Sequence, residues 1–312
     1  MASGSIDNIR EPDLMAATRS DAEVNPKMSV KTSDSAAGGA DAKSVLVDFE
    51  DGIAWVTLNR PDKRNAINPA IVFEMVDTLN ALEADDRAQV VVITGAGDSF
   101  SSGQDLKEYF REPDAGPPIE RERLYRANAD WQWRRLMFYP KPTIAMVNGW
   151  CFGGAFQVLL GCDLAVADEE AVFGLSEINW GIIPAGIVTK SVAMALAQRN
   201  ALYYIMTGDN FDGKRAAEIG LVNFAVPKAE LRDRTRALAK KLMEKNPFVM
   251  RAAKTAYHHV RHMSWESSLE LLMAKSDQSK FRDPEKGDQK GMSQFLDAKA
   301  YRPGLSAYDR KR

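Results

Sequence analysis

The chain has 312 residues, of which 45% are hydrophobic and 27% are charged. This length fits one large domain or two small ones and suffices for a sizeable core. The 41 basic and 43 acidic residues leave no excess positive charge to hold a phosphate backbone, which argues against nucleic acid as the main partner. No stretch approaches the roughly 20 uninterrupted apolar residues of a membrane-spanning helix, so no membrane partner is expected.

Residues 1–43 differ in composition from the rest of the chain. They contain no aromatic residue and are dominated by serine, alanine, aspartate and glycine. Such a segment cannot bury enough apolar surface to offset its ordering entropy, which predicts a disordered tail. Its five basic and seven acidic residues argue against an organelle transit peptide, and it has no apolar region for secretion. The sequence therefore favours a cytoplasmic protein.

After the tail, the first elements are a hairpin and a helix. Two runs rich in β-branched and aromatic residues, Val45–Phe49 and Ile53–Leu58, flank the pair Asp51 and Gly52, which is a strong hairpin signal. An asparagine and a proline then begin an amphipathic stretch over residues 68–82, which predicts a helix with proline in its first turn.

Four continuous apolar runs follow, as expected of buried parallel strands. They are Val90–Gly95, Ile144–Val147, Leu164–Ala167 and Val222–Val226, with helical patterns between them. Strands that alternate with helices predict an α/β fold. From Ala229 to about Ala300 the pattern is almost purely helical. We therefore expect a core over residues 44–228 and a helical C-terminal region over residues 229–312.

The cysteines and histidines are few. Cys151 and Cys162 lie in apolar surroundings, which predicts buried free thiols in a reducing compartment. All the histidines fall within residues 258–262. His258 and His262 share one face of a predicted helix, but no third metal ligand is evident, so no metal site is predicted. No histidine is placed to activate Cys151, so nucleophilic catalysis by this cysteine is not expected.

Two glycine-containing loops, Ser99–Lys107 and Asn148–Gln157, each follow a predicted strand. Glycine lets backbone N–H groups approach a ligand closely, and the start of a following helix adds unpaired donors. Two such loops that converge at strand ends could form an oxyanion hole. Ordinary strand-to-helix turns have the same composition, so either loop alone is a weak signal.

The segment Phe173–Pro184 places a carboxylate, that of Glu177, between apolar residues. Burial there would raise its pKa toward a value useful for proton transfer, whereas the alternative is a helix cap or a surface acid. Trp131 and Trp133, on the predicted polar helix over residues 120–136, are expected to pack rather than to bind a ligand.

The order of these features resembles the crotonase superfamily, which contains the enoyl-CoA hydratases and isomerases. The resemblance runs from about Val45 to the C-terminus, with Asn59–Ala66 as an early landmark. Within the superfamily the chain is most similar to the hydroxycinnamoyl-CoA (feruloyl-CoA) hydratase-lyases. The segments that carry this similarity are Asp105–Glu112, Ala145–Gly154, Phe173–Gly181 and Tyr203–Gly208.

The resemblance implies roles for individual residues. The backbone N–H groups of Gln104 and Gly154 would hold the thioester oxygen, and Glu177 would be the acid/base. Tyr109 would recognise an aromatic ring, and Trp180 would bind substrate beside it. The expected residues for the coenzyme A end are Lys63, Arg64, Ala66, Asp105 and Leu106. Lys63 and Arg64 could equally be solvated surface charges.

Two positions depart from the pattern of the relatives. Ordinary hydratases of the superfamily have a second glutamate where this chain has Gln157, and the hydratase-lyases have a serine there. Glutamine donates and accepts hydrogen bonds but exchanges no proton near neutral pH, which leaves Glu177 as the one acid/base. Met273 stands where the hydratase-lyases have a second tyrosine for the substrate phenol, and methionine has no hydroxyl group. A less polar aromatic group or a bulkier acyl group is therefore an alternative substrate.

The resemblance implies a spiral of repeated ββα units that forms two roughly perpendicular sheets, followed by a helical C-terminal region. It also implies a homotrimer or homohexamer in which residues 229–312 supply the contacts, so that Met273 could line its own pocket or that of a neighbour. The implied activity is hydration of an aromatic α,β-unsaturated acyl-CoA, followed by retro-aldol cleavage to an aldehyde and acetyl-CoA. No cofactor is needed, since coenzyme A is part of the substrate.

Two other functions remain open at this stage. A one-glutamate enoyl-CoA isomerase, or a hydratase for another acyl chain, needs no more than a single carboxylate. A binding protein with the same fold and no turnover is a third possibility, against which the intact Glu177 and both glycine loops count.

Overall fold

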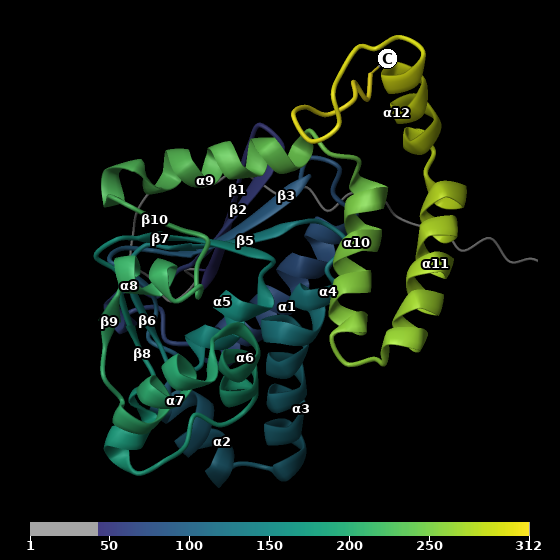
Figure 1. The fold of residues 1–312 in the computed structure, drawn as a ribbon. Coiled ribbons are helices and arrows are strands. Elements are labelled where there is room, and N and C mark those ends of the chain that lie inside the picture. The colour runs from purple at the N-terminus through teal and green to yellow at the C-terminus, as the bar shows by residue number, and fades with distance from the viewer. Residues whose placement is uncertain (1–42, 312) are drawn as a thin grey trace, which may run out of the picture. The chain divides into compact units, whose positions relative to one another are not determined.

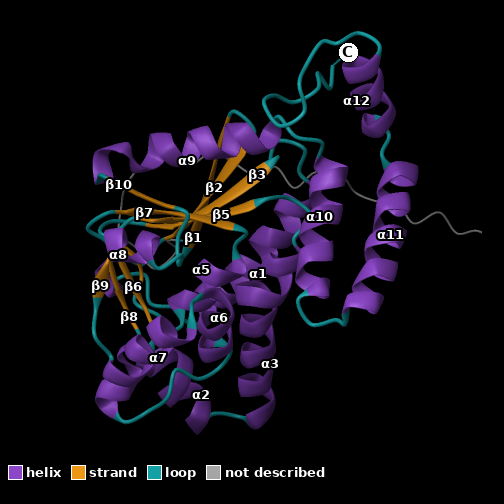
Figure 2. Ribbon diagram, in the orientation of Figure 1, coloured by secondary structure: helices purple, strands orange, loops and turns teal. Residues whose placement is uncertain are grey.

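The computed structural model describes residues 43–311, and apart from Lys43 the predicted disordered tail lies outside this range. The strands form a larger sheet in the order β1-β2-β3-β5-β7-β10 and a smaller sheet in the order β4-β6-β8-β9. Figure 2 shows that the strands of the smaller sheet run in a different direction from those of the larger one. The strands are β1 (Val45–Glu50), β2 (Ile53–Leu58), β3 (Val90–Gly95), β4 (Ser99–Ser101), β5 (Thr143–Val147), β6 (Trp150–Phe152), β7 (Leu164–Asp168), β8 (Val172–Gly174), β9 (Phe211–Asp212) and β10 (Phe224–Val226).

Helices surround both sheets (Figure 1). The α-helices are α1 (Pro69–Ala84), α2 (Glu112–Ala115), α3 (Pro118–Ala129), α4 (Leu136–Phe138), α5 (Ala155–Gly161), α6 (Val188–Ala195), α7 (Gln198–Thr207), α8 (Gly213–Glu218), α9 (Lys228–Met243), α10 (Pro247–Val260), α11 (Trp265–Arg282) and α12 (Gly287–Leu296). Two 3-10 turns, η1 (Pro61–Lys63) and η4 (Ser176–Trp180), and two π-helical segments, η2 (Leu106–Arg111) and η3 (Asp130–Arg135), complete the described elements. Within residues 43–311 no helix is both long enough and apolar enough to cross a membrane.

The predicted hairpin and the predicted first helix are both confirmed. Strands β1 and β2 pair antiparallel, and the φ angles of Asp51 and Gly52 are +50° and +85°. A two-residue turn with positive φ at both positions matches the right-handed twist of the flanking strands. Helix α1 begins at Pro69, and the side chain of Asn68 caps it by accepting a hydrogen bond from the Ile71 N–H.

The middle of the chain repeats one unit. Each pair of consecutive strands, β3 with β4, β5 with β6 and β7 with β8, puts its first strand in the larger sheet and its second strand in the smaller one. The strands of successive units pair parallel within each sheet. Helices separate the units, as right-handed crossovers between parallel strands require. The α/β class and the repeated ββα arrangement are therefore as predicted.

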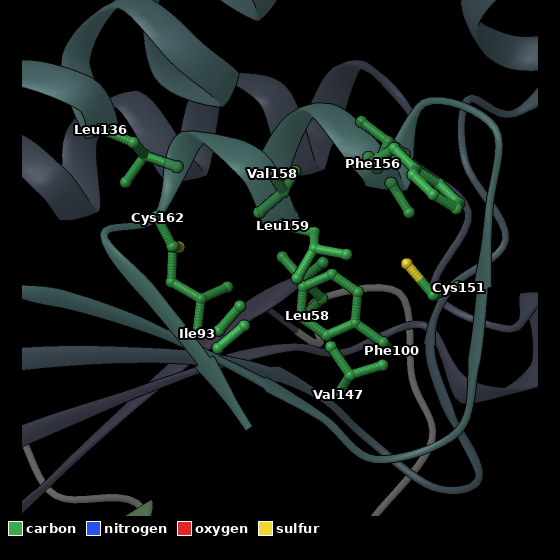
Figure 3. Close-up of a cluster of buried hydrophobic side chains, with 14 of the residues drawn as sticks. Leu58, Ile93, Phe100, Leu136, Val147, Cys151, Phe156, Val158, Leu159 and Cys162 are labelled. Carbon is green, nitrogen blue, oxygen red and sulfur yellow. The ribbon is translucent and has the colours of Figure 1, made fainter. Parts of the chain in front are cut away.

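Both faces of the central strands of the larger sheet are buried, which explains why β3, β5 and β7 read as nearly continuous apolar runs. Figure 3 shows one face, where Val158 and Leu159 of α5 point toward Leu58 and Phe100. The opposite face carries Trp55, Val92 and other strand residues and is covered by α9. The core fixes the start of α5, and α5 carries several residues of the site described below.

One predicted strand starts later than expected. Strand β10 begins at Phe224 rather than Val222. The backbone N–H groups of Leu221 and Val222 instead donate to the Ala216 carbonyl oxygen at the end of α8. This turn, which contains Gly220 at a φ angle of +78°, keeps the two apolar residues out of the sheet although they are buried.

The predicted helical C-terminal region is observed as α9 to α12. Helices α10 and α11 lie side by side (Figure 1). Helix α11 has no buried residue, and several large apolar side chains on it are exposed, among them Trp265, Leu269 and Met273. The proposed boundary at residue 228 stays a sequence-based prediction.

Candidate active site

A cavity of about 980 Å³ lies where the two glycine loops meet. Its walls come from the Gly103 loop, η2, the α3–η3 helix, the start of α5, η4 and the start of α6. Apolar and aromatic side chains predominate, and few charged groups reach it. Such a concave, mainly apolar space with a small number of convergent polar groups is typical of a small-molecule site.

The glycine loops approach each other so closely that a Cβ atom at Gly103 or at Gly154 would meet atoms of the opposite loop. A Cβ atom on Gly103 would lie 2.7 Å from the Phe152 carbonyl oxygen and 3.0 Å from the Gly154 nitrogen. Gly103 also has a φ angle of +88°, which favours glycine. A Cβ atom on Gly154 would lie 1.4 Å from Gln104 Oε1. The predicted convergence of the two loops is therefore present in the structure.

The convergence leaves two backbone donors beside the cavity. The N–H groups on either side of Gln104, those of Gly103 and Asp105, donate to Ser101 Oγ and the Ile67 carbonyl oxygen. Within residues 43–311, neither the Gln104 N–H nor the Gly154 N–H donates to a protein acceptor. Both residues line the cavity. A pair of preorganised N–H groups in a partly buried site has the chemistry of an oxyanion hole.

Glu177 is the one glutamate or aspartate that lines this cavity. It is 8% exposed, and its Oε2 atom has no hydrogen-bond partner among the described residues. A Cβ atom on Gly153 would lie 3.0 Å from Glu177 Oε1, so the carboxylate sits against the second glycine loop. Burial raises the pKa of Glu177 above its ordinary value, and a hydrogen bond from its own backbone opposes this only in part. The carboxyl group is thus suited to accept and return a proton.

Gln157 lines the same cavity from α5 and is 7% exposed. Its amide nitrogen lies near Gly186 across the cavity, where a Cβ atom would come within 2.9 Å. The amide can donate and accept hydrogen bonds at this point but is not a second titrating group.

An aromatic wall lies at another part of the cavity. Tyr109 is 6% exposed, and its ring stacks on that of Tyr125 with centroids 5.4 Å apart. The ring of Phe110 meets that of Tyr109 edge to face at 5.0 Å. Burial raises the pKa of Tyr109, so its hydroxyl group stays protonated near neutral pH. Trp180, which is half exposed, completes the predicted substrate residues found at the cavity.

The residues predicted for coenzyme A lie mostly beside the cavity rather than in its wall. Lys63 and Arg64 are exposed, and their carbonyl oxygens accept hydrogen bonds from the hydroxyl and N–H groups of Ser102, which does line it. The Arg64 guanidinium lies over the Trp150 ring, 4.6 Å from its centroid. Ala66 is buried behind them, and its carbonyl oxygen accepts from Arg60.

Asp105 and Leu106 begin η2. Asp105 Oδ1 accepts hydrogen bonds from the N–H groups of Lys107 and Glu108, and its other oxygen is 3.1 Å from Arg60 Nη1. Burial raises the pKa of Asp105, but these hydrogen bonds outweigh it and hold the pKa below its ordinary value. Asp105 therefore caps a helix and pairs with Arg60, whereas Leu106 is exposed and lines the cavity.

Met273 does not join the other predicted site residues within this chain. It lies on α11, is 60% exposed, and is absent from the wall of the cavity. Contact with the pocket of a neighbouring subunit stays a prediction.

Sequence reasoning missed several residues of the cavity wall. Trp133, expected to pack, lines the cavity, whereas Trp131 is fully buried in the core. Two residues apart on a helix point to nearly opposite sides, so one tryptophan faces each way. Tyr125 and Asn128 line the cavity from the same helix. Their spacing with Trp133 was a usable signal, but the charged residues that dominate the first half of this helix, Glu120–Arg123, obscured it.

The site does not include a recognisable metal centre. Within residues 43–311 no group of three or more histidine, cysteine, aspartate or glutamate side chains is placed to hold a metal ion. Cys151 and Cys162 are free and buried, as predicted, and burial raises the pKa of both thiols.

Comparison with known proteins identifies the family. The family described as enoyl-CoA hydratase/isomerase matches residues 48–302. The hydroxycinnamoyl-CoA hydratase-lyase of Pseudomonas fluorescens is 56% identical over 268 residues, which cover 86% of this chain and 97% of the relative. The 2,3-dehydroadipyl-CoA hydratase of Escherichia coli is 32% identical over 225 residues, 72% of this chain and 86% of the relative.

Solved structures agree. An enoyl-CoA hydratase from Polaromonas superposes with a TM-score of 0.74 at 26% identity, covering 81% of this chain and 96% of that one. The enoyl-CoA hydratase of Mycobacterium smegmatis gives 0.73 at 26% identity, over 82% and 96%. The matches span nearly the whole described chain, including both glycine loops and Glu177. This chain belongs to the enoyl-CoA hydratase/isomerase, or crotonase, family.

Proposed function

We propose that this chain hydrates the double bond of a hydroxycinnamoyl-CoA thioester and then cleaves the product to an aromatic aldehyde and acetyl-CoA. The observation that carries the proposal is a single buried carboxylate, Glu177, in one cavity with two unused N–H donors and an aromatic wall. The similarity to the hydratase-lyase of Pseudomonas fluorescens supports this choice of substrate.

In the hydration step, the oxygen of a water molecule bonds to the β-carbon, and the electron pair of the double bond moves onto the thioester. Glu177 takes a proton from the water, and the N–H groups of Gln104 and Gly154 hold the enolate oxygen that results. Each such donor contributes roughly 3–4 kcal/mol to the transition state in comparable sites. Glu177 then returns the proton to the α-carbon, which gives the β-hydroxy thioester.

In the cleavage step, Glu177 removes the proton of the β-hydroxyl group. The bond between the α- and β-carbons breaks, the β-carbon becomes the aldehyde, and the electron pair forms the enolate of acetyl-CoA. The same two N–H groups stabilise this enolate, because its charge again lies on the thioester oxygen. Return of the proton to the α-carbon yields acetyl-CoA. The amide of Gln157 orients water by hydrogen bonds and takes no part in proton transfer.

The remaining features of the proposal concern the surroundings of the site. We assign the coenzyme A end to the mouth of the cavity near Ser102, where Lys63, Arg64 and Leu106 lie. The reaction requires no cofactor besides the coenzyme A of the substrate. The exposed apolar face of α11 supports a homotrimer or homohexamer built on residues 229–312. A cytoplasmic location suits this substrate.

A second candidate is an enoyl-CoA isomerase or a hydratase of another acyl chain. The single carboxylate favours it as well, since one carboxylate suffices to move a proton between two carbons of an enoyl-CoA.

The deciding experiment incubates the purified protein with feruloyl-CoA and follows vanillin and acetyl-CoA by liquid chromatography. Equal amounts of both products are expected. Accumulation of the β-hydroxy thioester without aldehyde would show that the protein is a hydratase instead. If feruloyl-CoA does not react but an aliphatic enoyl-CoA does, the proposal of an aromatic substrate is refuted.

Glu177→Gln provides the control for the chemistry. The amide has the shape of the carboxyl group but moves no proton, so kcat is expected to fall by roughly 10²–10⁴-fold while coenzyme A binding persists. A variant that keeps more than about a tenth of the wild-type rate would show that Glu177 is not the acid/base.

A further inference from the structure

Two buried amides lie on one helix at the aromatic wall of the cavity. Asn128 ends the third turn of α3 and is 6% exposed, and Gln132 follows it on η3 and is fully buried. Asn128 Nδ2 donates to Gln132 Oε1 at 2.9 Å, and the same oxygen accepts from Gln104 Nε2 at 3.2 Å. The three amides therefore form a continuous chain from the aromatic wall to the loop that carries one of the oxyanion-hole donors.

The free end of this chain is an unpaired polar atom. Asn128 lines the cavity, and its Oδ1 atom has no hydrogen-bond partner among the described residues. A buried polar atom without a partner destabilises a fold, and native proteins retain one where a ligand supplies the missing group. The bond to Gln132 occupies the other end of the Asn128 amide, so the unpaired atom is the one left to meet a ligand.

The groups around Asn128 indicate what that ligand is. Ala129 and Trp133 flank it on the helix, and the stacked rings of Tyr109 and Tyr125 lie beside it in the wall. The Asn128 amide also lies close to the Tyr109 hydroxyl, where it acts as a hydrogen-bond donor and partly offsets the rise in the Tyr109 pKa caused by burial, while Asn128 Oδ1 stays without a partner. Flat apolar surfaces with one amide and one hydroxyl among them fit an aromatic ring that carries a hydroxyl group.

We infer that Asn128 is a specificity-determining residue that hydrogen-bonds the ring hydroxyl of a hydroxycinnamoyl-CoA, with Tyr109 as its partner in the same contact. This assignment rests on the proposed function, because it requires an aromatic acyl group in the cavity. A phenolic hydroxyl group both donates and accepts, so it satisfies the Asn128 amide and the Tyr109 hydroxyl together. A substrate without the hydroxyl group leaves Asn128 Oδ1 buried and unpaired, which disfavours that substrate.

The test compares 4-hydroxycinnamoyl-CoA with cinnamoyl-CoA in wild type and in Asn128→Leu, which has nearly the same shape and no polar atom. The ratio of kcat/KM for the two substrates is expected to fall on the order of tenfold in the variant. Asn80→Leu makes the same substitution at an exposed position of α1, outside the cavity, and is expected to leave the ratio unchanged. A ratio within about twofold of wild type in Asn128→Leu would overturn the inference.

Two further measurements keep the result interpretable. If Asn128→Leu fails to fold, as judged by circular dichroism, Asn128→Ser retains a small polar group, and the same fall in the ratio is expected because its hydroxyl is too short to reach the ring. If wild type cleaves neither substrate, the proposed function fails. The ratio of dissociation constants for the two thioesters, measured by calorimetry, then decides the role of Asn128 alone, and an equal ratio in wild type and variant refutes it.

Discussion

Glu177 lies in a buried environment that disfavours its ionised form, and this affects the stability of the fold as well as the chemistry of the site. Burial raises its pKa above the ordinary value of 4.5. Below that pH the carboxyl group is protonated in the folded and the unfolded chain alike. As the pH rises from 4.5 through the raised pKa, the unfolded chain releases its proton more readily, so the folded state loses stability. The loss is complete above the raised pKa.

Glu177→Gln is therefore expected to stabilise the protein at pH 7 and to have little effect below pH 4.5. The measurement is the urea midpoint of unfolding for wild type and variant at the two pH values. Glu266→Gln, at an exposed position of α11, serves as the control with no expected difference. A gain of the same size at both pH values would mean that ionisation of Glu177 is not its cause.

At the scale of single residues, the sequence identifies groups that stand in recognisable local patterns and misses those that do not. The glycines and apolar flanking residues of the loops allowed three site residues to be predicted, namely Gln104, Gly154 and Glu177. The structure brings all three to one cavity. Asn128 and Tyr125 lie on a helix rich in arginine and glutamate, where nothing local marks them. Their contribution depends on the way that helix crosses the cavity, which is a property of tertiary structure.

At the scale of elements, the two glycine loops differ in what they demand of the backbone. Gly103 combines a φ angle of +88° with close contacts to backbone atoms, so a side chain there must displace the other loop. Gly154 has an ordinary φ angle of −60°, and the atoms nearest to an added Cβ all belong to the side chain of Gln104. Substitutions at these two glycines therefore distinguish a loss of stability caused by backbone strain from a loss of activity caused by disturbance of the site.

Gly103→Ala is expected to lower both stability, by about 1–3 kcal/mol, and activity, whereas Gly154→Ala lowers mainly kcat because displaced Gln104 disturbs the oxyanion hole. Gly97→Ala is the matched comparison, since its φ angle is +72° but it lies outside the cavity wall. This variant should lose stability and keep its activity. The measurements are the melting temperature and kcat of the three variants. A Gly154→Ala variant as unstable as Gly103→Ala would contradict the expected difference between the two glycines.

A largely buried ion pair joins helix α10 to the core. Lys254 Nζ lies 2.8 Å from Asp163 Oδ2 and also donates to the Leu136 carbonyl oxygen at 3.0 Å. Burial raises the pKa of Asp163 and lowers that of Lys254, and their mutual attraction opposes both shifts. Each charge therefore depends on the other, since removal of one partner leaves the second buried without its counter-ion.

Lys254→Met is expected to lower the free energy of unfolding by about 3 kcal/mol, measured by urea denaturation. The double variant Lys254→Met with Asp163→Asn should lose less than Lys254→Met alone, because no uncompensated charge remains. A double variant that loses the sum of the two single effects would show that the ion pair has no coupling energy.

The elements themselves were predicted with few errors, and the errors have physical causes. The central strands of the larger sheet are recognisable because both of their faces pack against helices, so most of their residues are apolar. The start of strand β10 was predicted too early, because Leu221 and Val222 are apolar residues that lie in a buried turn and not in the sheet. The short strands of the smaller sheet escaped notice altogether, because three residues are too few to show a period.

At the scale of the whole molecule, α11 stands out because it has many apolar side chains and none that is buried. Exposed apolar surface of this extent is typical of a contact between chains. Sequence patterns could show that these residues are apolar and helical, but not which surface covers them. Met273 belongs to this group, so its relation to a substrate depends on assembly.

The assembly is expected to be a trimer or hexamer in multi-angle light scattering at micromolar concentration. Leu269→Glu, on the exposed part of α11, should shift the protein to smaller species because it places a charge in the apolar contact. Ile119→Glu, at a similarly exposed position of α3, is the control and should keep the wild-type mass. A monomeric wild-type protein would refute the role of α11.

The spiral also sets an order in which the molecule can be made. Successive ββα units are neighbours in both sheets, so a new unit can add to the edge of the preceding one while the rest of the chain is still being synthesised. The residues that carry the proposed chemistry, from Gly103 to Glu177, all belong to these early units. Helices α10 to α12 leave the ribosome last. A nascent chain can thus complete its catalytic pocket before it exposes the helix by which we expect it to join its partners.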